Sequence, residues 1–178
     1  ILENRVENKD QFQFHYLDYL YAMSKLYQLD FVTAKNYFLR FTNNFKGKNY
    51  IKAAYHKLFL ISFMTDSISD QELYANLVLV NGNLLIEEDL QAENDIKKNR
   101  SLNYDLLLSR ILFDGGYYSK SLVVLNEVNL DNFDLNSDYK NEYYYRIARA
   151  NQKIINNPHE KISLFFKVLD QEDLSNLY

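Results

Sequence analysis

The sequence predicts an all-α protein made of antiparallel helix hairpins, and three observations support this fold class. The 178 residues include one proline and four glycines, whereas a β-sandwich or barrel needs many turn residues. Apolar residues recur at steps of three and four over long stretches, which is the period of an amphipathic helix. Residues 102–128 form two such stretches, interrupted only at Gly115-Gly116. Helices joined by so short a break must lie antiparallel, and they need neighbouring hairpins to bury their apolar faces.

Length and composition fit one domain over residues 1–178 and argue against several classes of protein. The net charge is −4 and the basic residues are scattered, so no nucleic-acid partner is expected. No apolar run approaches the roughly 20 residues of a membrane-spanning helix, so direct membrane insertion is not expected. The absence of cysteine excludes disulfides and thiolate metal sites, and it leaves the compartment open. Because the chain begins at Ile1, we expect a processed product or a fragment.

The first hairpin is expected over about residues 10–45. Its helices span about residues 10–29 and 31–45, and Asp30 is the expected N-cap, whose carboxylate accepts a bond from a first-turn amide. Gly47 is expected to end the second helix as a C′ glycine. The second helix carries an unbroken apolar seam, formed by Phe31, Ala34, Phe38, Phe41 and Phe45.

The second hairpin is expected over about residues 49–80. Asn49 can begin a helix that continues to about Met64, and Ser69-Asp70-Gln71-Glu72 has the pattern of a capping box that opens the next one. Asn81-Gly82 lies between two apolar runs, so a type I′ turn and a β-hairpin are an alternative there. The leucines and the capping box favour a helix that ends at Gly82.

A polar insertion is expected over about residues 84–100. An extended segment leads into a helix from Glu87 to about Lys98, whose acidic start and basic end suit the helix dipole. Glu87, Glu88 and Asp89 could pass for catalytic carboxylates. We interpret them instead as a solvated first turn.

The third and fourth hairpins are expected over about residues 102–128 and 138–169. Between them lies a polar loop, residues 129–137. The fourth hairpin has a helix to about Ile155, and then a restart at Asn157-Pro158, with asparagine as N-cap and proline at the first helical position. Its last helix is expected to bury Ile162, Phe165, Phe166 and Leu169.

Three of the hairpins share a pattern of offsets. A small residue on the first helix is followed about twelve positions later by a residue on the second, and bulky residues follow at four and three more. Small side chains let the two helices touch, and the bulky ones fill the space toward the next hairpin. The three sets are Ala22, Ala34, Phe38 and Phe41; Ser109, Ser121, Leu125 and Val128; and, with a gap two residues longer, Ala148, Ile162, Phe166 and Leu169.

This pattern resembles the tetratricopeptide repeat (TPR) family, in which a small residue, an alanine and an aromatic residue four positions later form the signature. The family's tryptophan and its closing proline are absent here. The resemblance implies a right-handed α-solenoid of about four TPR-like hairpins with an inserted polar helix. Residues 45–52 and 112–118 also look like stretches of uncharacterised bacterial TPR proteins, which are often exported.

In that family the first helix of each hairpin lines a concave groove, and the resemblance carries this role to particular residues. Arg110 and Arg149 fall at equivalent places, so they could lie side by side and bind a carboxylate. The alternative is that each pairs with a local acid, Asp105 or Glu142. The candidate groove residues are Tyr19, Met23 and Tyr27 from the first hairpin; Asn103, Leu106, Arg110 and Phe113 from the third; and Tyr145, Arg149 and Gln152 from the fourth.

No catalytic, cofactor or metal site is predicted. His15, His56 and His159 are isolated from one another, and residues 45–49 lack the second glycine and the Ser/Thr of a phosphate-binding loop. We therefore expect a non-enzymatic scaffold that binds an unknown protein or peptide in the groove. Two alternatives remain open: a structural spacer that forms a homodimer, and a helical domain that binds a small ligand or sugar through its tyrosines. Richness in Asn, Lys, Ile and Tyr suits a bacterial source, and the resemblance favours export over a cytoplasmic location.

Overall fold

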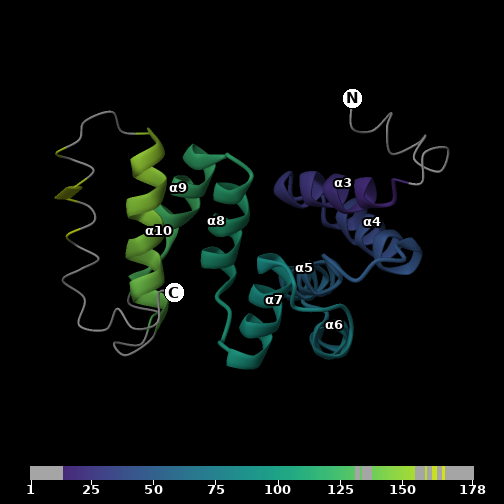
Figure 1. The fold of residues 1–178 in the computed structure, drawn as a ribbon. Helices are drawn as coiled ribbons and strands as arrows, with labels where there is room; N and C mark the ends of the chain where they lie inside the picture. Colours follow the sequence, from purple (N-terminus) through teal and green to yellow (C-terminus); the bar gives the residue numbers. More distant parts are fainter. Residues whose placement is uncertain are drawn as a thin grey trace. The chain divides into compact units, whose positions relative to one another are not determined.

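The computed structural model describes residues 14–130, 133 and 138–154 and the single positions 159, 162, 163 and 166, and all its regular elements there are helices. The all-α prediction is therefore confirmed for this part of the chain. The chain divides into two compact units, residues 1–101 and 102–178 (Figure 1). No helix among the described residues combines the length and apolar character needed to cross a membrane.

The described residues of unit 1 form two helix hairpins and one further helix. The first hairpin is α3 (Tyr16–Tyr27) and α4 (Phe31–Asn44), and the second is α5 (Ile51–Met64) and α6 (Ile68–Val80). Helix α7 (Glu87–Lys98) follows and lies against α5. Its bounds agree with the predicted polar helix. The alternative β-hairpin at Asn81-Gly82 is wrong, because α6 runs to Val80.

The described residues of unit 2 form one complete hairpin and a third helix. The hairpin is α8 (Tyr104–Asp114) and α9 (Tyr118–Glu127), and α10 (Asp138–Ile154) packs against both of its helices. The core of unit 2 consists of Leu106, Leu125 and Phe133, so the aromatic residue of the predicted loop is a core residue. Six partly buried residues surround this core: Leu122, Val128, Leu130, Tyr139, Tyr143 and Ile147.

The hairpins α3–α4, α5–α6 and α8–α9 turn in the same way, over three residues each. The middle residue of each turn has a positive φ: Leu29 at 62°, Asp66 at 54° and Gly116 at 83°. In each case the amide of the next residue donates to a carbonyl five residues earlier, and the amide of the middle residue donates to one three residues earlier. Among the described residues, three hairpins of different sequence therefore share one turn geometry.

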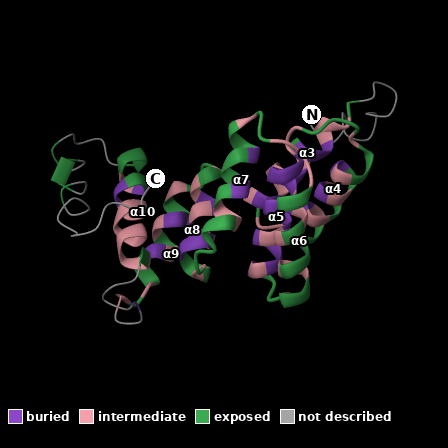
Figure 2. Cartoon of the chain, turned by 60° about the horizontal axis from the view of Figure 1, so that its bottom comes forward, coloured by how far each residue is buried: buried purple, intermediate pink, exposed green. Residues whose placement is uncertain are grey.

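The small residues predicted at the contact between the two helices of a hairpin are buried. Ala22 and Ala34 have no exposed surface, and Ser109 and Ser121 are almost as buried. In unit 2 the Ser121 hydroxyl also donates to the backbone carbonyl of Ser109, at 2.9 Å. Figure 2 shows the buried positions running along the helices, with α5 buried along most of its length and α6 largely exposed.

Three predictions about helix ends in unit 1 are wrong, and one is confirmed. Asp30 caps α4, since its carboxylate accepts from the amide of Thr33. Helix α4 ends at Asn44 with Phe45 extended, so Gly47 is not its C′ residue. Helix α5 begins at Ile51 rather than at Asn49, whose side chain instead accepts from Asn83. The expected capping box fails because α6 already begins at Ile68, which places Ser69 inside its first turn.

The start of the helix predicted from residue 10 lies outside the described residues. So does most of the second helix of the fourth hairpin. Two of its predicted core residues are described, and both are more than half exposed: Ile162 at 52% and Phe166 at 57%. The prediction that they are buried is therefore wrong. The Asn157-Pro158 restart and the positions Phe165 and Leu169 are among the residues that are not described.

Candidate functional site

The candidate site is a surface of unit 2 formed by α8 and α10, which we call the α8–α10 face. It consists of Arg110 and Phe113 from α8 and of Tyr145, Arg149 and Gln152 from α10. On α10 these positions follow one another at steps of four and three, so they share one side of the helix. All five belong to the groove predicted from the sequence.

Arg149 is the centre of this face. Its guanidinium carbon lies 5.0 Å from the centre of the Phe113 ring and 5.6 Å from that of the Tyr145 ring, so two aromatic rings contact it. One of its terminal nitrogens donates to the Tyr145 hydroxyl at 3.1 Å. The Phe113 ring is itself held by Tyr118, whose ring centre is 5.1 Å away. Contact between a guanidinium and aromatic rings orients the group and is favourable in itself.

Arg149 also differs from its neighbours in charge pairing. Among the residues that the structure describes, no carboxylate lies within ion-pair distance of Arg149, and its side chain is exposed. Arg110 pairs with Asp114 at 3.9 Å on its own helix. Arg146 donates from two of its nitrogens to one oxygen of Glu142. Among the described residues, Arg149 is thus the cation of this face that has no carboxylate beside it.

Arg146 was not predicted, although its charge interacts with that of Arg110. Burial lowers the pKa of Arg146, and the charge of Arg110 lowers it further, while Glu142 opposes both effects. The spacing of Glu142 and Arg146, four residues on one helix, could have indicated this pair from the sequence. Local acids do neutralise arginines here, as the alternative expected, but the pairs are Arg110–Asp114 and Arg146–Glu142.

Two other predicted groove residues of α8 have structural roles. The side chain of Asn103 is the N-cap of α8, accepting from the amide of Leu106 at 3.1 Å. Leu106 is 1% exposed and belongs to the core of unit 2. Neither side chain is therefore available to a ligand without a loss of helix capping or of core packing.

The three candidates from the first hairpin lie in unit 1. Tyr19 is buried, and its ring contacts those of Tyr16, Phe41 and Tyr50 at centroid distances of 5.5, 5.4 and 5.2 Å. Burial raises the pKa of Tyr19, and neighbouring tyrosines and acids raise it further. Tyr19 is therefore a core residue and not a groove residue. Met23 and Tyr27 are half-buried, and a groove that joins them to the α8–α10 face stays a prediction.

The described face supports recognition by charge and aromatic contact. The N–H groups of Arg149 that do not donate to Tyr145 can form further hydrogen bonds, and the fork of a guanidinium matches the two oxygens of a carboxylate. A comparison with protein-family models, curated proteins and solved structures gives no match for this chain.

Proposed function

We propose that this protein is a non-enzymatic interaction scaffold, and that the α8–α10 face binds a protein or peptide partner. The arrangement of Arg149 carries the proposal: it is an exposed cation in contact with Phe113 and Tyr145, without a carboxylate partner among the described residues. An arginine that served only the stability of unit 2 would be expected to pair with an acid, as Arg110 and Arg146 do.

The partner would contact this face through a carboxylate flanked by apolar atoms. The carboxylate would accept hydrogen bonds from the free edge of the Arg149 guanidinium, and Gln152 could donate one more. Neighbouring apolar groups of the partner would contact the exposed parts of Phe113 and Tyr145. Because the two rings already orient Arg149, little side-chain freedom would be lost on binding. The same resemblance to TPR proteins that predicted a solenoid supports a binding face on these two helices.

The first test is affinity capture with the whole chain and three single variants. In Arg149→Glu the charge of the face is reversed, and in Phe113→Ala one of its aromatic contacts is removed. Lys120→Glu is the matched control, because it makes the same charge change at an exposed position of α9, a helix that contributes no residue to the face. Any partner recovered is then titrated as a purified protein against each of the four chains.

Loss of one charge-assisted hydrogen-bonded contact is expected to weaken binding by about 10- to 100-fold, since such bonds contribute roughly 1.5–3 kcal/mol. We expect this loss for Arg149→Glu, a smaller one for Phe113→Ala, and little change for Lys120→Glu. Circular dichroism checks that each variant keeps its helices. A partner that binds the folded Arg149→Glu and Phe113→Ala variants as tightly as the wild type would contradict the α8–α10 face as the site.

A further inference from the structure

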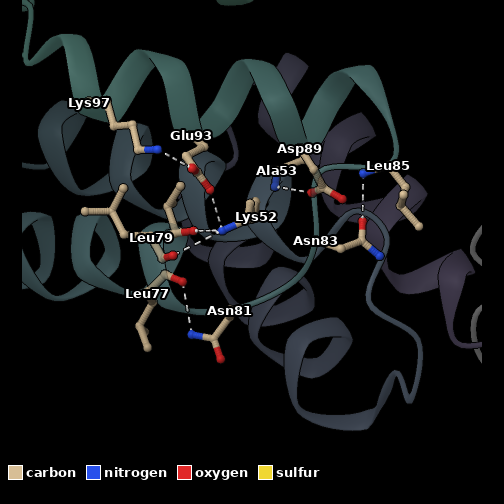
Figure 3. A network of polar contacts seen from close by, with 11 residues as sticks. Lys52, Ala53, Leu77, Leu79, Asn81, Asn83, Leu85, Asp89, Glu93 and Lys97 are labelled. Carbon is tan, nitrogen blue, oxygen red and sulfur yellow. Dashed lines mark hydrogen bonds and ion pairs between the residues drawn. The ribbon is translucent and has the colours of Figure 1, made fainter.

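Helix α7 packs against the rest of unit 1 through a charged surface. Its buried residues are Asp89, Ala92 and Glu93, with exposed fractions of 0%, 2% and 8%, so two of the three carry a carboxylate. Asp89 and Glu93 are four positions apart and therefore lie on one side of the helix. The prediction that the first turn of this helix is solvated is wrong for Asp89. Figure 3 shows this side of α7 directed at α5.

Asp89 caps the start of α5 from a distance in the sequence. Its two oxygens accept from the amides of Tyr50 and Ala53, at 2.7 and 2.9 Å. First-turn amides have no partner inside their own helix, and Tyr50 offers no side-chain cap to α5. The sequence predicted that this helix begins at Asn49, whereas its first amides are capped by a residue of another helix. Burial raises the pKa of Asp89, and the amides of α5 act against that rise.

Glu93 meets a lysine that is almost fully buried. The Lys52 ammonium lies 2.7 Å from Glu93 Oε2, and it also donates to the carbonyls of Val78 and Leu79 at the end of α6, at 2.7 and 3.2 Å. An ammonium has three donors, so each has a partner. Hydrogen bonds from Lys52 and then Lys97 lower the pKa of Glu93. One turn further, His56 Nε2 lies 3.8 Å from Asp95 Oδ2.

Along α5 from Tyr50 to His56, the groups that meet α7 are backbone amides without a partner in their own helix, then the Lys52 ammonium, then the His56 imidazole. The three carboxylates of α7 meet them in the same order along the chain. We propose that this side of α5 is a binding site for acidic helices, and that α7 is its intramolecular and exchangeable occupant. A partner helix with carboxylates four residues apart would bind there once α7 leaves. This site is in unit 1 and does not depend on the α8–α10 face.

The polar character of the contact favours exchange. Buried ion pairs are nearly neutral in net free energy, because the cost of removing the charges from water offsets much of their attraction. Apart from Ala92, the apolar residues of α7 are half-buried or exposed: Ile96 is half-buried, and Leu90 is 38% exposed. The same interactions are recovered in full when another acidic helix takes the place of α7.

The test uses the full chain and a labelled peptide of residues 84–100. In the variant Asp89→Asn/Glu93→Gln the chain's own α7 loses both carboxylate charges while α5 is unchanged. We expect this variant to bind the wild-type peptide at least about tenfold more tightly than the wild-type chain does, by fluorescence anisotropy. A peptide carrying the same two substitutions is the control and should not bind. A folded variant that binds the wild-type peptide no better than the wild-type chain does would overturn the proposal.

A second measurement applies even if that variant does not fold. In the wild-type chain, hydrogen exchange should be faster for the amides of α7 than for those of α5 by at least about tenfold, because α7 opens while α5 stays formed. Equal protection of the two helices would show that α7 leaves only when unit 1 unfolds, and this result would also overturn the proposal.

Discussion

In each unit a further helix packs against a hairpin: α7 in unit 1 and α10 in unit 2. The two units hold this helix by different interactions. In unit 2, α10 is held by apolar and aromatic side chains: Tyr139 and Tyr143 contact Phe133 at ring distances of 5.6 and 6.5 Å, beside Leu106 and Leu125. In unit 1, α7 is held by the carboxylates of Asp89 and Glu93 (Figure 3). Apolar contact of the kind that holds α10 is not directional. The carboxylates of α7, in contrast, each have particular partners in α5.

The largest expected effect is on the charged contact. Replacing Lys52 by methionine leaves Glu93 buried without its main cation and leaves two carbonyls of α6 without a donor. Loss of one partner of a buried pair costs about 3–5 kcal/mol in the free energy of unfolding. Chemical denaturation should show this loss for Lys52→Met, and little change for Lys48→Met, where the lysine is exposed.

The double variant Lys52→Met/Glu93→Leu makes the same test sharper. Removing both charges should restore most of the stability, since an apolar pair of similar size often replaces a buried ion pair at little cost. If the double variant is as unstable as Lys52→Met, the ion pair is not the reason for the loss. The unpaired carbonyls of α6 would then carry it.

In unit 2 the corresponding change is Leu125→Ala. Leu125 has no exposed surface and lies in the core against which α10 packs. A buried leucine replaced by alanine costs about 2–5 kcal/mol, because apolar contact is lost and a cavity is left. Val123→Ala is the control on the same helix, since Val123 is 58% exposed. Equal losses for the two variants would contradict the position of Leu125 in the core.

The difference between the units also explains which features could be predicted. Apolar periodicity located the helices, and the small residues Ala22, Ala34, Ser109 and Ser121 marked fully or almost fully buried positions on both helices of two hairpins. These signals are local in sequence. The core role of Tyr19 was missed because a half-polar aromatic residue suits both a core and a groove.

The role of Asp89 could not be predicted by the same reasoning. Its partners, the amides of Tyr50 and Ala53, are 39 and 36 residues away. Because almost every residue has a backbone amide, the residue types give no sign of which amides it caps. An acidic residue in a first turn is normally explained by its own helix dipole. In the candidate site, the sequence indicated Phe113, Tyr145 and Arg149 separately, but the contact of the guanidinium with both rings required the structure.

The smallest expected effect concerns the contact between the two helices of a hairpin. Here unit 2 is the more polar of the two units. At this position unit 2 uses a hydrogen bond, from the Ser121 hydroxyl to the carbonyl of Ser109, and unit 1 uses Ala22 and Ala34. Replacing Ser121 by alanine keeps the side chain small and leaves the carbonyl its helical partner, so the cost should be about 0.5–1.5 kcal/mol. Ser119→Ala, at an exposed position of the same helix, should cost less. A loss above the range of one hydrogen bond would mean that this contact depends on more than a small side chain. Serine and alanine would then not be equivalent at this position of a hairpin.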